Sequence, residues 1–183
     1  MSGGSKIKKL VICSLCCALT CVCAVITIPI GVIPITLATV PVYISGAVLG
    51  SGYGAISQIL YLLLVFVGLP FTSKLVGGAA YFTGPTAGYM VGYVPMAFIV
   101  GYVYKTFTAS RRRILDKMFM FFVGAVIGTL VCYLFGTAWF SFQSKVKFLN
   151  ALKVCVYPFL IGDFIKILVS MLIVPKIESA VNI

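Results

Sequence analysis

Two charged residues stand close together in an otherwise apolar stretch near the end of the chain. Asp163 and Lys166 lie within "YPFLIGDFIKILVSMLIVP", residues 157–175, and the 183-residue chain has only three acidic residues. Charged side chains inside a membrane span are costly, and they usually face a bundle interior or a cavity. On a helix the two side chains share one face, since they are three residues apart. They form either a polar ligand site or a self-neutralising ion pair that only holds a helix bundle together.

Few other residues could do chemistry. The chain has no histidine, which excludes a histidine-based acid–base or zinc site, and its other two acids, Asp116 and Glu178, cannot easily pair with Asp163 as a catalytic dyad. It also lacks the G-x-x-x-x-G-K phosphate loop. Five of the seven cysteines lie between Cys13 and Cys23 without a nearby acid, and we interpret them as small packing residues. We therefore expect no enzyme, no metal site and no cofactor.

The composition places Asp163 and Lys166 in a membrane protein. The residues are 62% hydrophobic and 9% charged, against roughly 25% charged in soluble domains, and the mean hydropathy is +1.18. The apolar runs are long and do not alternate with polar residues, which indicates helices rather than strands. We predict an all-α integral membrane protein with a single membrane domain over residues 1–183. The net charge of +11 fits basic residues that flank membrane spans better than it fits binding to nucleic acid.

Six apolar segments are predicted as transmembrane helices, separated by proline-rich and glycine-rich breaks. The prolines of "PIGVIPIT", residues 29–36, end the first helix, and "GSGYG", residues 50–54, is predicted to be a tight turn. A longer irregular region, Leu69–Pro85, contains the pair Gly77 and Gly78, and we expect it to be a lid or binding loop. The predicted spans are about 10–28, 37–49, 55–68, 86–104, 118–140 and 154–174.

The first and last spans have further features. The basic start and apolar run of 10–28 fit a cleaved secretory signal as well as a retained first helix, and we expect a retained helix. Small residues recur every four positions along it, which favours close approach of another helix. In the last span, Pro158 suits the first turn of a helix. Asp163 would then lie five residues, or roughly 8 Å, from the outer helix end.

The basic residues predict the orientation of the spans. With six spans and a cytoplasmic N-terminus, nine Lys and Arg residues lie inside and four lie outside. This asymmetry favours cytoplasmic positions for both termini and an outer position for the glycine-rich loop. The inner residues are Lys6, Lys8, Lys9, Lys105, Arg111, Arg112, Arg113, Lys117 and Lys176, and the outer residues are Lys74, Lys145, Lys147 and Lys153.

Five segments, in order along the chain, resemble the motifs of one transporter family. They are "VIPITLATVPVYISGAVLG" from residue 32, "LYLLLVFVGLPF" from residue 60, "GGAAYFTGPTAGYMVGY" from residue 77, "CYLFGTAWF" from residue 132 and "YPFLIGDFIK" from residue 157. Together they resemble the BioY type, the biotin-specific S components of energy-coupling factor (ECF) transporters, from Pro34 to Val174. The chain departs from that pattern at Ala38, where the family often has Gln, at Ala87 in place of Gly and at Ile161 in place of Pro.

The resemblance implies an ECF S-component-like bundle of six helices in a prokaryotic plasma membrane. Such a protein captures biotin from outside, docks onto a membrane-embedded T component with two ATP-binding subunits, and topples to release the vitamin inward. Alternatives are an S component for another small vitamin or a non-transporting membrane scaffold. The expected substrate-binding residues are Asp163, Lys166, Thr36, Gly77, Gly78, Tyr81, Phe82 and Tyr89.

Overall fold

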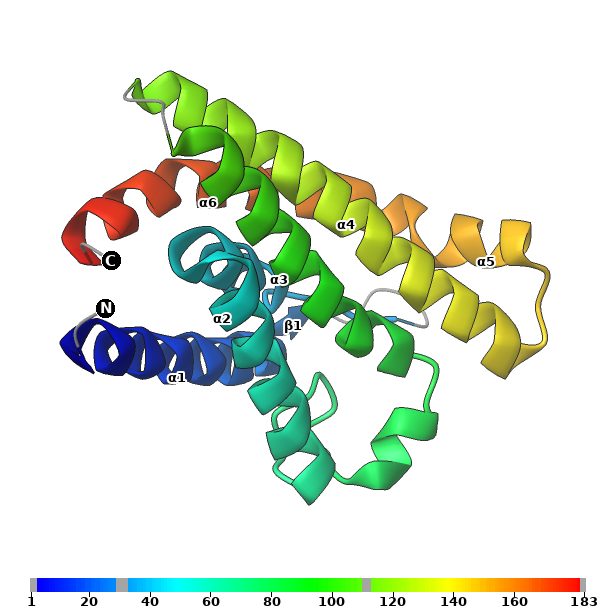
Figure 1. Cartoon of the computed structure of the whole chain (residues 1–183). Coiled ribbons are helices and arrows are strands. Elements are labelled where there is room, and N and C mark those ends of the chain that lie inside the picture. Colours follow the sequence, from blue (N-terminus) through cyan, green and yellow to red (C-terminus); the bar gives the residue numbers. More distant parts are fainter. Residues whose placement is uncertain (1–2, 29–32, 110–112, 182–183) are drawn as a thin grey trace.

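The computed structural model describes residues 3–28, 33–109 and 113–181. Across these residues the chain forms six α-helices, as predicted, with a two-stranded antiparallel sheet and a short 3₁₀-helix (Figure 1). Part of the predicted proline-rich break, residues 29–32, and two residues of the basic loop, Arg111 and Arg112, lie outside the described residues. The elements are α1 (Gly3–Val25), β1 (Thr27–Ile28), β2 (Ile35–Thr36), α2 (Thr39–Val67), η1 (Ala79–Thr83), α3 (Ala87–Thr108), α4 (Ile114–Ser144), α5 (Phe148–Cys155) and α6 (Tyr157–Val181).

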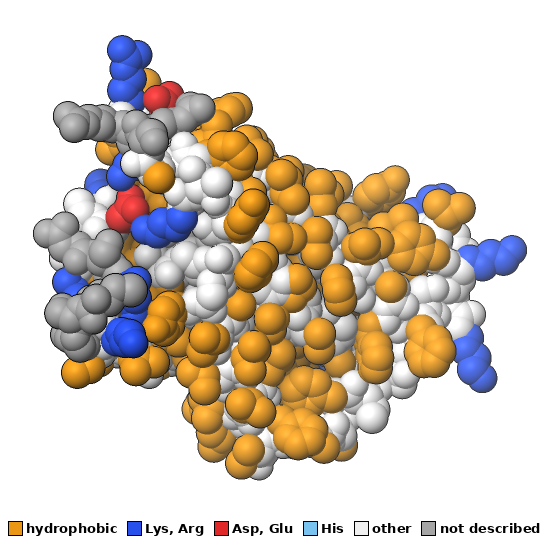
Figure 2. Space-filling model, in the orientation of Figure 1, with side chains coloured by type: hydrophobic (Ala, Val, Ile, Leu, Met, Phe, Trp, Pro, Cys, Tyr) orange, Lys and Arg blue, Asp and Glu red, His pale blue; other side chains and the backbone are white. Residues whose placement is uncertain are grey.

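The surface of the bundle is that of a membrane protein. Within the described ranges, five helices are long and apolar enough to cross a membrane, namely α1, α2, α3, α4 and α6. Many of their large apolar side chains point outward, among them Val67, Phe142 and Leu172. Figure 2 shows hydrophobic side chains over the middle of the visible face, with Lys and Arg side chains gathered toward two ends. The chain is therefore a multi-pass membrane protein.

Helix α2 is sharply bent and contains two of the predicted spans. Gly50, with φ +82° and ψ 178°, has a conformation that is essentially open to glycine alone. Beyond the bend, Gly54 lies against Gly46, because a Cβ on Gly54 would come 2.8 Å from the Cα of Gly46. The predicted turn over residues 50–54 is wrong in extent, because residues 51–54 are helical. The chain changes direction at Gly50 alone.

Helices α3 and α4 lie side by side (Figure 1) and approach closely at glycines. A Cβ on Gly128 would come 3.1 Å from the carbonyl oxygen of Met96, and one on Gly124 would come 3.2 Å from the Cβ of Val103. Gly124 and Gly128 thus form a G-x-x-x-G pair that lets α4 pack closely on α3. Further along α4, Gly136 leaves room for the ring of Tyr89, which a Cβ would approach within 2.3 Å.

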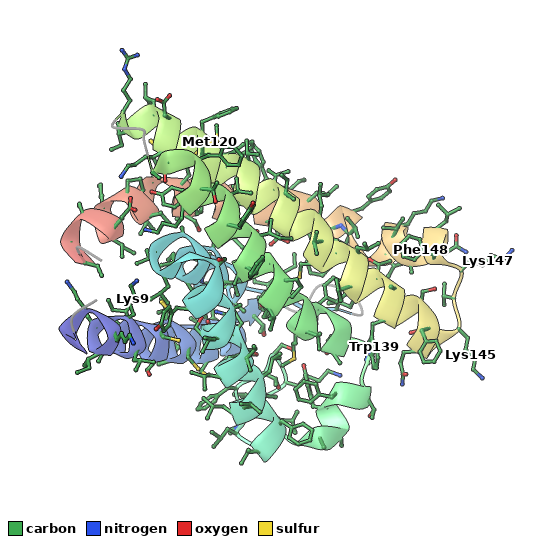
Figure 3. The ribbon with its side chains drawn as sticks, viewed as in Figure 1. Lys9, Met120, Trp139, Lys145, Lys147 and Phe148 are labelled. Carbon is green, nitrogen blue, oxygen red and sulfur yellow. The ribbon has the colours of Figure 1, made fainter. Side chains whose placement is uncertain are left out.

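One carboxylate joins three helices at the end of the molecule where the first turn of α1 and the last turn of α6 lie (Figure 1). Glu178 of α6 accepts hydrogen bonds from Lys105 Nζ at 2.9 Å, Lys117 Nζ at 3.1 Å and the Tyr104 hydroxyl at 2.8 Å. These contacts tie α6 to the last turn of α3 and the first turn of α4. In Figure 3, Lys145 lies at the opposite end of the view from Lys9 of α1.

Candidate functional site

Asp163 and Lys166 face the interior of the bundle in the first half of α6. The helix begins at Tyr157, with Pro158 in its first turn, so Asp163 lies six residues, or about 9 Å, from the helix start. The side chains belong to residues that are only 5% and 7% exposed, respectively. Lys166 Nζ donates a hydrogen bond to Asp163 Oδ1 at 2.7 Å. The two charges thus form the ion pair that their spacing allows, and whether they also form a ligand site depends on what surrounds them.

A tyrosine from another helix completes the pair. Tyr133 of α4 is buried, and its hydroxyl donates a hydrogen bond to the second oxygen of Asp163, Oδ2, at 2.6 Å. A carboxylate oxygen has two lone pairs, so each oxygen of Asp163 keeps capacity for one more donor. The Tyr133–Asp163–Lys166 cluster is therefore neutral in total charge and still able to accept hydrogen bonds.

This cluster forms part of the wall of a cavity. The wall takes side chains from α1, β2, α2, the segment between α2 and α3, α3, α4 and α6. The volume is about 70 Å³, well below the roughly 300–1,000 Å³ of pockets that hold drug-sized ligands. A ligand of vitamin size would therefore have to push wall side chains, or the loop between α2 and α3, outward when it binds.

Five of the eight predicted substrate-binding residues line this one cavity. Besides the ion pair, they are Thr36 of β2, Tyr81 of η1 and Tyr89 of α3. The sheet helps to place Thr36, because Thr36 pairs with Thr27 directly after α1. Tyr89 is held by its hydroxyl, which donates to the carbonyl oxygen of Cys155 at 3.3 Å.

The other three predicted residues lie outside the cavity wall. Gly77 has a packing role, since a Cβ there would come 2.3 Å from the carbonyl oxygen of Leu69. Gly78 has φ +102°, and its N–H donates to the carbonyl oxygen of Val65 at 2.7 Å, which folds the loop back onto the end of α2. The ring of Phe82 packs edge-to-face on Phe66 with centroids 5.7 Å apart.

The loop between α2 and α3 forms one side of the cavity through its polar side chains. The Tyr81 hydroxyl lies 3.3 Å from both Ser73 Oγ and Thr86 Oγ1, and all three residues line the cavity. The end of the loop is fastened to α4, because Trp139 Nε1 donates to the carbonyl oxygen of Gly84 at 2.9 Å. The loop thus lies against the cavity, and its role as a cover over a bound ligand stays a prediction.

Tyr133 is not among the residues predicted from the sequence, although a signal for it exists. Thr129, Tyr133 and Thr137 recur every four residues on the apolar helix α4, so they make a polar stripe on one face. Thr129 and Tyr133 line the cavity, and Thr137 lies within hydrogen-bond distance of the Tyr89 hydroxyl at 3.3 Å. A polar stripe on a membrane helix faces protein rather than lipid, and this reasoning would have placed Tyr133 in the interior.

The fold and this site define a multi-pass membrane protein that encloses a small cavity, with a buried ion pair in its wall, between its helices. A model of the BioY family matches residues 1–183. The chain therefore belongs to the BioY family, which confirms the resemblance seen in its motifs.

Curated relatives and a solved structure support this assignment. The chain is 38% identical to the biotin transporter BioY of Rhizobium etli over 133 residues, which cover 72% of this chain and 71% of the relative. It is 31% identical to the probable biotin transporter BioY of Pyrococcus horikoshii, over 95% of this chain and 98% of the relative. The fold matches the crystal structure of the S-component for biotin from an ECF-type ABC transporter with a TM-score of 0.86 and 28% identity, over 98% of this chain and 95% of that one.

Proposed function

We propose that the protein is the biotin-binding S component of an ECF-type uptake transporter, taking biotin from the outer face and releasing it to the cytoplasm. The observation that carries the proposal is the buried Tyr133–Asp163–Lys166 cluster in the wall of a cavity between the helices. The relatives support biotin as the ligand, since those compared above carry the name of biotin transporters or of an S-component for biotin.

The chemistry of the cavity suits biotin. The free lone pairs of Asp163 can accept from the ureido N–H groups, and the ammonium of Lys166 can donate to the ureido carbonyl or to the carboxylate of the tail. Tyr61 and Tyr93, whose ring centroids are 6.4 Å apart, add aromatic surface to the cavity wall for the fused apolar ring. A ligand that leaves these buried polar groups unpaired would bind poorly, which gives the site its selectivity. Biotin acts here as the transported substrate, and no cofactor is required.

The energy for transport would come from partners. The sequence has no phosphate loop of its own, so two ATP-binding subunits and a membrane-embedded T component would supply it. A groove between α1 and the second half of α2 offers a docking face for the T component. On α1 it is lined by Ser14, Cys17, Ala18, Cys21 and Val22. The first four have small side chains, which let another helix approach closely.

Titration of biotin into the protein purified in detergent tests the proposal directly. We expect saturable binding with a Kd below about 1 μM, or roughly −8 kcal/mol. If biotin does not bind at micromolar concentration and another small vitamin does, that vitamin would be the substrate. Absence of binding for every vitamin tested would favour the scaffold alternative.

A further inference from the structure

The polar side chains around the cavity are almost completely paired with one another or with the backbone. Tyr61 donates to the carbonyl oxygen of Phe71 at 3.0 Å, and Thr72 donates to that of Val76 at 2.6 Å. Thr129 donates to the carbonyl oxygen of Ala125 at 2.7 Å. Buried polar groups are normally satisfied in this way, so an exception in the same wall requires an explanation.

One residue of the wall carries such an exception. Among the described residues, three buried side-chain oxygens lack a hydrogen-bond partner: Thr39 Oγ1, Gln58 Oε1 and Ser170 Oγ. Of these three residues, only Thr39 lines the cavity. Its hydroxyl can both donate and accept a hydrogen bond, and both capacities are unused.

The position of Thr39 in the chain explains why its hydroxyl has no internal partner. Threonines within helices commonly donate to the carbonyl oxygen four residues earlier, as Thr20 and Thr108 do here. Thr39 is the first residue of α2, so no helical turn precedes it and no such carbonyl is in place. The preceding residue, Ala38, has no polar side chain with which it could pair.

We propose that Thr39 is a specificity-determining residue whose hydroxyl hydrogen-bonds a polar group of the bound ligand. This inference rests on the proposed function and adds a contact that the motif-based predictions did not include. The ligand then meets two separate polar elements of the wall: the Tyr133–Asp163–Lys166 cluster from α4 and α6, and the start of α2. A ligand with polar atoms at more than one place, such as biotin, satisfies both.

The test compares two substitutions at the same position in the full-length protein. Thr39→Val keeps the shape of the side chain and removes the hydroxyl, whereas Thr39→Ser keeps the hydroxyl. We expect Thr39→Val to raise the Kd for biotin about tenfold, or about 1.4 kcal/mol. We expect Thr39→Ser to stay within about threefold of the unmodified protein, since the hydrogen bond is retained. The measurement is calorimetric titration of biotin in detergent.

The melting temperature of the ligand-free protein separates ligand binding from a structural role. Thr39→Val removes a buried hydroxyl without a partner, so the ligand-free protein should melt at the same temperature or higher. The matched control is Ser170→Ala, which removes another unpaired buried hydroxyl away from the cavity and should leave the Kd unchanged.

Three results would overturn the inference. They are an unchanged Kd in Thr39→Val, an equal rise of the Kd in both Thr39 variants, and a lowered melting temperature or loss of folding in Thr39→Val that Thr39→Ser does not share. If the unmodified protein itself fails to bind biotin, the proposed function fails as well, and that result is distinct from the other three.

Discussion

The carboxylate of Asp163 joins two helices and at the same time faces the cavity. Its oxygens accept from Lys166 on the same helix and from Tyr133 on α4. Removing one partner of a buried ion pair leaves the other charge uncompensated, which is more costly than the pair itself is stabilising. The structural interpretation and the ligand interpretation of this pair are therefore compatible, and substitutions at Asp163 should affect both stability and binding.

Asp163→Asn is expected to lower the affinity for biotin at least about tenfold, or about 1.4 kcal/mol. The amide is close to the carboxylate in shape, but it loses the negative charge and one acceptor oxygen. Titration calorimetry measures the effect, with the melting temperature followed in parallel. A lower melting temperature together with an unchanged Kd would mean that the pair only stabilises the bundle.

Tyr133→Phe should weaken biotin binding by about threefold to tenfold, because the Asp163 carboxylate loses a donor that fixes its orientation. Tyr102→Phe is the matched control. Tyr102 is 56% exposed, and its hydroxyl has no hydrogen bond within the part of the chain that the structure describes. The Kd of the two variants is compared by titration. Equal affinities would show that Tyr133 does not contribute to the site.

At the scale of the elements, glycines set how closely the helices around the cavity approach. Gly101 of α3 lies directly against the bend of α2, because a Cβ there would come 2.5 Å from the carbonyl carbon of Gly50. Backbone atoms cannot rotate away as a side chain can, so contact between backbones tolerates no added atom. Gly50 therefore allows the chain to bend, and Gly101 leaves the space into which the bend packs.

Gly101→Ala should lower the melting temperature by several degrees, since overpacking costs about 1–3 kcal/mol. Gly52→Ala is the control, because a Cβ at Gly52 of α2 would meet nothing within 4 Å. Alanine is the better helix former, so Gly52→Ala should be neutral or slightly stabilising. Thermal unfolding in detergent measures both, and equal melting temperatures would argue against close backbone contact at Gly101.

The helices themselves were predictable from sequence, and their junctions were only partly so. Long apolar runs bounded by Pro and Gly indicate helices because lipid leaves the backbone few alternatives. The same composition does not show at which glycine of "GSGYG" the helix bends, since the position of the bend depends on the close approach of Gly101. The predicted span over 154–174 likewise joined the end of α5 to α6, which are separate helices.

The candidate site was predictable where a residue was conspicuous by its type. Asp163 and Lys166 stand out because charges are rare in apolar helices. Tyr133 stands out only through the polar stripe that it forms with Thr129 and Thr137 on α4. Thr39 does not stand out, because threonine is common in membrane helices and only tertiary packing shows that this one lines the cavity. Gly77 and Gly78 were predicted near the ligand because their loop could close over it. In the structure they lie outside the cavity wall and shape the loop, and their contact with a ligand stays a prediction.

At the scale of the whole molecule, charge is distributed between two ends. The only acid in the last turns of α6, Glu178, is surrounded by Lys105, Lys117 and Tyr104. Lys145 lies at the other end (Figure 3), directly after α4. In a multi-pass protein the end with more Lys and Arg faces the cytoplasm, so we predict that Glu178 lies inside and Lys145 outside.

Cysteine substitutions at the two ends test this orientation in intact cells. Lys145 and Lys176 are both exposed, whereas six of the seven native cysteines are buried and Cys23 is only partly exposed. We expect a membrane-impermeant thiol reagent to label Lys145→Cys in whole cells and to label Lys176→Cys only after the membrane is opened. The unmodified protein supplies the background, since a buried thiol reacts slowly. The reverse labelling pattern would place the termini outside. The start of α6, near which Asp163 lies, would then face the cytoplasm, and this is incompatible with capture of biotin from the outer face.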